Sequence, residues 1–184
     1  DSQDNAYEEV SEYNREPWLI NFPGSEEGYV LDLFRVTGGN RHEYTLQGDA
    51  NNASQFSTDL SLAPYGEYLL PEGTVVIEPE DSQQTGSAGG HYYAYMHVKD
   101  VEHTALADGR YAINMSTTVD GAPGAGMKII GQADADSDLY IGKSPALTKL
   151  RTERIDTNEA NLPYTMPKLV LRREGTNNNL QSTL

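Results

Sequence analysis

The stretch YVLDLFRVTGGNRHEYTLQ, residues 29–47, decides the fold class of this 184-residue chain. In residues 29–36 apolar side chains occupy both odd and even positions, which is typical of a central strand buried on both faces. The glycines of Thr37-Gly38-Gly39-Asn40 permit the positive φ angles that tight turns require. Residues 41–47 then alternate between apolar and polar side chains, as a half-buried strand does. We therefore predict that the two segments form a β-hairpin.

Further β patterns recur along the chain between turns rich in Gly and Pro. Strands are predicted at residues 74–78, 91–99, 110–118, 127–130, 139–141, 168–173 and 180–184. Residues 48–72 lack periodicity and are predicted to be a long surface excursion, and residues 121–126 a connection. This spacing predicts an all-β fold, an antiparallel two-layer β-sandwich with little helix, over residues 27–184. Residues 1–26 are expected to be a lead-in segment, and the last strand is expected to continue beyond Leu184.

The composition excludes several classes of function. The chain has 13 Lys and Arg against 28 Asp and Glu, a net charge of −15, which argues against nucleic acid as a partner. It has no Cys, so a disulfide scaffold, a thiolate metal site and a Cys nucleophile are all excluded. No apolar run reaches the roughly 18 residues of a membrane span, and no span is expected. Common nucleotide-binding, hydrolase and zinc-protease motifs do not occur.

Positive charge is concentrated near the C-terminal end. Residues 143–184 carry seven basic and four acidic residues, whereas the preceding residues carry six and 24. The basic residues are Lys143, Lys149, Arg151, Arg154, Lys168, Arg172 and Arg173. One interpretation is that they neutralise nearby acidic strands, and the other is that they bind an anionic ligand.

The acidic turn Asp134-Ala-Asp136-Ser-Asp138 is similar to the opening of a calcium-binding loop. The sixth position holds Leu139 instead of Gly and the twelfth holds Pro145 instead of Glu. A solvated acidic turn is therefore the first interpretation, and weak calcium binding by the three aspartates is the alternative. No other cofactor is expected.

The predicted strand at residues 91–99 places Tyr93 and Tyr95 on one face with His and Lys side chains. Tyrosine rings beside such groups can stack on sugars and form hydrogen bonds with their hydroxyl groups. The alternative is ordinary packing of Tyr on a half-buried strand face.

Two stretches resemble the heparinase II/III-like family of polysaccharide lyases. In the first, residues 29–44, a strand containing Asp-Leu-Phe-Arg-Val turns through Gly-Gly and returns with His-Glu-Tyr. The second combines LYIGKSPAL, residues 139–147, with YTMPKLVLRREG, residues 164–175. The resemblance implies a supersandwich-like β-domain of a secreted or periplasmic enzyme that cleaves uronic-acid glycans, such as alginate or heparan sulfate, by β-elimination.

Family members combine this β-domain with a catalytic α/α-toroid, which would be the partner of this chain within the same parent protein. No catalytic residue can be carried over, and we expect the chain alone to be inactive. Candidate residues for contact with an acidic polysaccharide are His42, Tyr44, Tyr93, Tyr95, Arg151, Arg154 and Arg172. The alternatives are a stand-alone carbohydrate-binding module and a purely structural interface domain.

Overall fold

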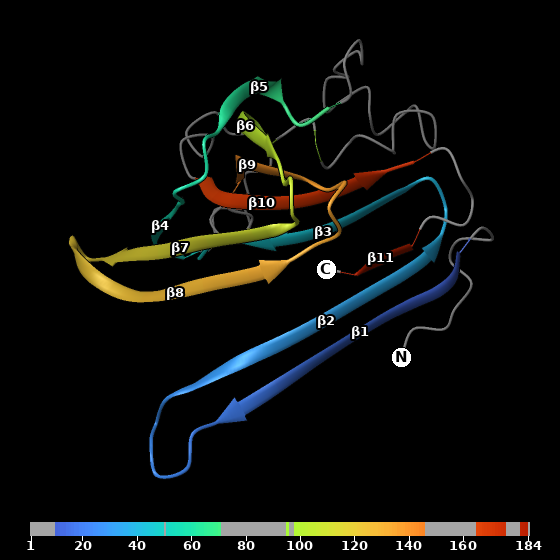
Figure 1. Cartoon of the computed structure of the whole chain (residues 1–184). Helices are drawn as coiled ribbons and strands as arrows, with labels where there is room; N and C mark the ends of the chain where they lie inside the picture. The colour runs from blue at the N-terminus through green and yellow to red at the C-terminus, as the bar shows by residue number, and fades with distance from the viewer. Residues whose placement is uncertain are drawn as a thin grey trace, which may run out of the picture.

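A computed structural model describes residues 10–49, 51–70, 95, 98–145, 165–175 and 181–183. All regular structure within these residues is β-strand, and every strand pairing is antiparallel (Figure 1). The strands are β1 Val10–Asn21, β2 Gly28–Gly38, β3 Arg41–Gln47, β4 Ala53–Ser57, β5 Ala63–Tyr68, β6 Lys99–Ala105, β7 Arg110–Val119, β8 Ala122–Gln132, β9 Asp138–Pro145, β10 Thr165–Glu174 and β11 Gln181–Thr183. The expected all-β antiparallel fold is confirmed.

The strands form three sheets. The central sheet has the order β3-β10-β9-β6-β5, the arm sheet β1-β2-β11, and the cover sheet β4-β7-β8. The arm and cover sheets both pack on the same face of the central sheet, which gives a sandwich of two layers. Phe34 of the arm sheet contacts Tyr44 of the central sheet, with 5.9 Å between ring centroids.

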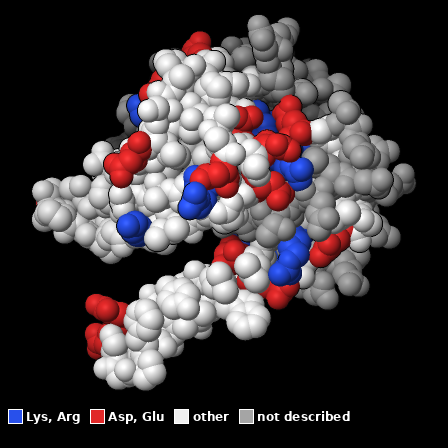
Figure 2. Space-filling view, viewed as in Figure 1, with Lys and Arg blue, Asp and Glu red and all other residues white. Residues whose placement is uncertain are grey.

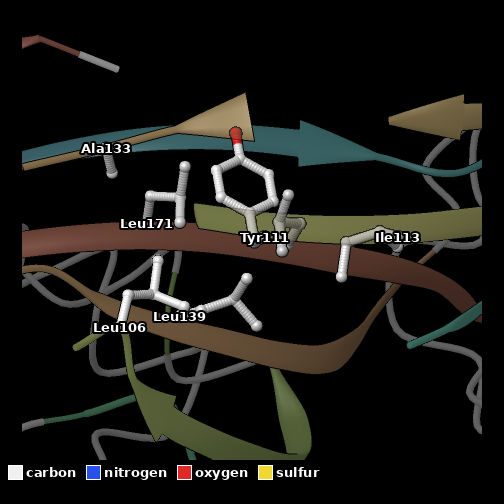
Figure 3. Packing of buried hydrophobic residues seen from close by; sticks show 7 residues of the cluster. Leu106, Tyr111, Ile113, Ala133, Leu139 and Leu171 are labelled. Atoms are coloured by element: carbon white, nitrogen blue, oxygen red, sulfur yellow. The ribbon is translucent and has the colours of Figure 1, made fainter. Parts of the chain in front are cut away.

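The main core lies between the cover sheet and the central sheet (Figure 3). Tyr111 and Ile113 project from β7, and Leu139, Leu169 and Leu171 project from β9 and β10. These side chains fall at alternate positions because successive residues of a strand point to opposite faces. The strand predicted at residues 110–118 is thus confirmed.

The opposite face of the central sheet carries a second, smaller apolar cluster. Leu69, Val98 and Val101 pack there with Tyr140 and Val170. Because β10 is covered on both sides, residues 169–172 are all buried.

The predicted hairpin between residues 29–36 and 41–47 is wrong, although both strands exist. β2 pairs with β1 and β11, whereas β3 pairs with β10. Gly38 and Gly39 have φ angles of 97° and 79°, and the chain there passes from one layer to the other. Packing between the layers, such as that of Phe34 on Tyr44, replaces the hydrogen bonds of a hairpin.

Three other segments differ from the sequence-based expectation. Residues 48–72 contain β4 and β5 instead of an excursion, and residues 122–126 belong to β8 instead of a connection. These strands are rich in Ser, Ala, Gly and Pro, so they lack the apolar alternation that identifies a strand. Residues 10–21 of the expected lead-in form β1, which pairs along its length with β2. The predicted strand at 74–78 and most of that at 91–99 lie outside the described residues. In the described part of 91–99 the prediction is wrong, because Tyr95 lies in a turn closed by a hydrogen bond from Val98 N to its carbonyl oxygen, and β6 begins only at Lys99.

Candidate functional site

The described candidate residues are divided between the two faces of the central sheet, with His42 and Tyr44 on one and Tyr95 and Arg172 on the other. His42 and Tyr44 point toward the arm sheet, whereas Glu43, between them, points toward the second apolar cluster. Side chains on opposite faces of one sheet cannot line a common site. The candidate residues therefore belong to two separate groups of polar side chains, one on each face of the central sheet, and do not form a single site.

The first group lies between β2 and β3. The Tyr44 hydroxyl donates a hydrogen bond to Asp32 Oδ2 at 2.9 Å, and Arg15 Nη2 lies 2.6 Å from the same oxygen. The hydrogen bond from Arg15 lowers the pKa of Asp32, and burial raises the pKa of Tyr44. His42 is buried and donates from Nε2 to the carbonyl oxygen of Gly38 at 2.6 Å. These contacts join the arm sheet to the central sheet.

The second group surrounds Glu43 and is called the Glu43 cluster. Arg172 Nε donates to Glu43 Oε1 at 2.6 Å, and Arg41 Nη2 lies 2.8 Å from that oxygen. The Tyr95 hydroxyl donates to the other oxygen, Oε2. The Arg172 guanidinium lies 4.7 Å from the centroid of the Tyr140 ring, and its side chain is only 3% exposed. The cluster is a largely buried ionic network on the face of the central sheet opposite the arm and cover sheets.

The titration behaviour of the Glu43 cluster follows from this geometry. Burial alone would raise the pKa of Glu43, but the hydrogen bond from Tyr95 and the charges of Arg172 and Arg41 bring it below its ordinary value. Burial and the hydrogen bond to Glu43 raise the pKa of Tyr95. Lys168 Nζ lies 5.9 Å from the Tyr95 ring centroid, and burial lowers its pKa.

An aromatic group that was not singled out from the sequence continues the Glu43 cluster toward β5. The Tyr140 ring packs edge-on against Tyr65 at 5.0 Å and stacks with His103 at 5.7 Å between centroids. The three residues come from β5, β6 and β9, which are adjacent in the central sheet. Alternation within each strand indicates their faces, but nothing local in the sequence indicates that these strands are neighbours.

The described members of the basic group at residues 143–173 are largely paired with acidic side chains. Lys143 Nζ lies 2.8 Å from Asp100, and Arg172 binds Glu43. Arg173 Nη1 lies 3.1 Å from Asp134, and Arg173 Nη2 lies 3.6 Å from Asp136. The neutralising interpretation is confirmed for these three residues. Tyr93, Arg151 and Arg154 lie outside the described residues.

The acidic turn at residues 134–138 is occupied by the Arg173 guanidinium. Asp138 begins β9, and burial raises the pKa of its carboxyl. In the described ranges there is no group of three or more His, Asp or Glu side chains arranged to hold a metal ion. The calcium interpretation thus stays a prediction without a geometric counterpart.

Comparisons with protein-family models, with curated proteins and with solved structures find no match for this chain. The described part of the chain contains no helix that is long and apolar enough to cross a membrane.

Proposed function

We propose that this chain is a non-catalytic β-sandwich module of a protein that degrades uronic-acid-containing polysaccharides. In this role it supports a catalytic α/α-toroid and supplies neither the acid nor the base. The proposal rests on two supports. One is the resemblance of residues 29–44 and 139–175 to lyase β-domains, and the other is the internal pairing of the candidate side chains.

The internal pairing is the observation that carries the proposal. β-Elimination needs a base that accepts a proton near the working pH and a cation that neutralises the uronate carboxylate. Tyr44 and Tyr95 both have raised pKa values, the wrong direction for a base. Arg172 is buried against Glu43 and cannot also bind a substrate carboxylate without leaving it.

The test is to incubate the purified chain with alginate, heparin and ulvan and to follow the ultraviolet absorbance of unsaturated uronate products. We expect no product above that of a heat-denatured sample. Affinity electrophoresis in gels containing the same glycans is expected to show no retardation, because three described cations are paired and the net charge is −15. Product formation would overturn the non-catalytic role, and retardation would favour a carbohydrate-binding module instead.

A further inference from the structure

The distal arm, defined as residues 17–31 of the β1–β2 hairpin, projects from the rest of the molecule. It exposes six large apolar side chains, and Trp18 is 55%, Leu19 72% and Val30 62% exposed. The others are Phe22, Tyr29 and Leu31. Its only charged residues are Glu26 and Glu27. Figure 2 shows the arm as a largely uncharged projection, separated from the body by an open slot.

Apolar side chains cover both faces of this arm. Residues directly opposite in the β1–β2 pairing share a face, and neighbouring pairs alternate. Leu19 is opposite Val30, and this pair lies on the face that Asp32 and Phe34 present to Tyr44 of the body. Trp18 is opposite Leu31, and that pair lies on the outer face. A two-stranded ribbon that is apolar on both sides is suited to burial on both sides.

The composition of the arm points to a protein surface as its partner. Exposed rings alone would suit a sugar, but here aliphatic side chains surround them on both faces, and contiguous apolar patches of this kind mark protein contacts. Pairing through the free edge of β1 is disfavoured because Pro17 has no N–H to donate. The contact is therefore expected through the faces of the ribbon.

We propose that the distal arm binds a second copy of this chain, with the arm of each copy lying in the slot of the other. The Leu19 faces of the two arms then contact each other, and each outer face with Trp18 contacts the body of the other copy. β8, across the slot from the arm in Figure 1, also exposes an apolar side chain, Ile130, on the face of the cover sheet away from the main core. Both faces of both arms are covered in this arrangement.

The exposed area is sufficient for such a dimer. A half-exposed large side chain offers about 100 Å² of surface, so six of them on each of two arms offer roughly 1,200 Å² in total. Stable interfaces begin at about this size. This inference is independent of the lyase proposal, since it uses none of the Glu43 cluster.

Charge gives the dimer a distinctive dependence on salt. Two copies with a net charge of −15 repel each other, and salt screens this repulsion without weakening apolar contacts. We therefore expect dimerisation to strengthen as salt concentration rises. A dimer held by ion pairs would instead weaken.

The experiment measures mass by light scattering after gel filtration of the full chain over a range of concentrations and at low and high salt. Trp18 is the only tryptophan, so its emission reports directly on the arm. We expect a dimer at the higher concentrations, with a blue shift of Trp18 emission that follows the dimer fraction. A monomer at all concentrations and salts would overturn the proposal.

Variants at Leu19 test which surface is involved. In a dimer of Leu19→Glu, or of Leu19→Lys, the substituted side chains of the two copies carry like charges and face each other between the arms. Each substitution is therefore expected to weaken the dimer by about thirtyfold or more. An equimolar mixture of the two variants is expected to form a heterodimer, because the charges are then opposite. The matched control is Ala63→Glu, an exposed position on β5 far from the arm in Figure 1, and it should leave the dimer unchanged.

Circular dichroism and thermal unfolding of each variant show whether the fold is retained. Leu19 is largely exposed, so both variants are expected to unfold at the temperature of the monomeric wild type. A dimer that persists in Leu19→Glu, or an equal loss in Ala63→Glu, would overturn the assignment to the arm. Failure of the two Leu19 variants to associate with each other would overturn the contact between the arms.

Discussion

Replacement of Glu43 by Gln removes the carboxylate that neutralises the buried Arg172 beside the second apolar cluster. Arg172 is only 3% exposed, so water cannot take over the role of Glu43. Removing one partner of a buried ion pair costs about 3–5 kcal/mol. The Glu43 side chain keeps 16% exposure, and Gln can still accept a hydrogen bond from Arg172. We therefore expect the lower end of the range, a loss of about 3 kcal/mol in the free energy of unfolding.

The assay is urea unfolding followed by far-ultraviolet circular dichroism. This signal reports on the whole fold, whereas fluorescence of Trp18 reports on the arm. Glu16→Gln is the matched control because it removes the same charge from an ion pair with Arg35 in which both side chains are 36% exposed. That variant is expected to lose less than about 1 kcal/mol. Equal losses in the two variants would refute the view that the Glu43 cluster is a buried network.

The pH dependence provides a second readout of the same substitution. The pKa of Glu43 is lower in the folded protein than its ordinary value, so the folded state binds fewer protons than the unfolded state. Its contribution to stability is then present above the unfolded pKa of about 4.3 and is lost as pH falls through the folded pKa. Glu43→Gln removes this contribution. The difference in stability between wild type and variant should narrow below about pH 4, and a constant difference would contradict this explanation.

Two further substitutions test the turns and the contact between layers. Gly109→Ala should cost about 3 kcal/mol or more, because its Cβ would lie 1.9 Å from the Ala133 carbonyl oxygen at a φ of 74°. Its control, Gly24→Ala, has nearly the same φ of 75° and no atom within 4 Å, so thermal unfolding should show only about 1–2 kcal/mol of backbone strain. Tyr44→Phe should lose about 1 kcal/mol in urea unfolding, because Asp32 loses one donor but keeps Arg15. No measurable loss there would show that the Tyr44 hydroxyl does not stabilise the contact between the layers.

The sequence was sufficient to predict β7, β9 and β10, which supply most of the buried side chains of the main core. In β7, apolar residues fall at every second position and the turn Asp108-Gly109 precedes them, so both type and face could be read locally. β4 and β5 were missed because, apart from Phe56, Tyr65 and Tyr68, their residues are small, polar or proline. Their strand conformation depends on pairing with β7 and β6, which is a tertiary effect.

The candidate site was less predictable than the fold because its contacts are distant in sequence. Glu43 and Arg172 are 129 residues apart and meet only because β3 pairs with β10. His42 and Arg172 were both candidates for glycan contact, yet alternation along β3 and β10 places them on different faces. Residue type alone could not distinguish a buried, neutralised Arg172 from an exposed one.

The first residues of the segment 29–36 belong to the distal arm, and there the sequence pattern predicted burial that the structure does not show. Residues 29–36 are apolar on both faces, and the rule for such a segment is a strand covered on both sides. From Phe34 onward β2 is buried on the face that packs on the central sheet, with Arg35 on the other face only partly covered, whereas Leu31 and the residues before it are exposed. The burial that the apolar pattern predicts for these residues is therefore reached only when a further protein layer covers the arm. The reciprocal contact with a second copy supplies that layer, and the Leu19 variants test this explanation directly.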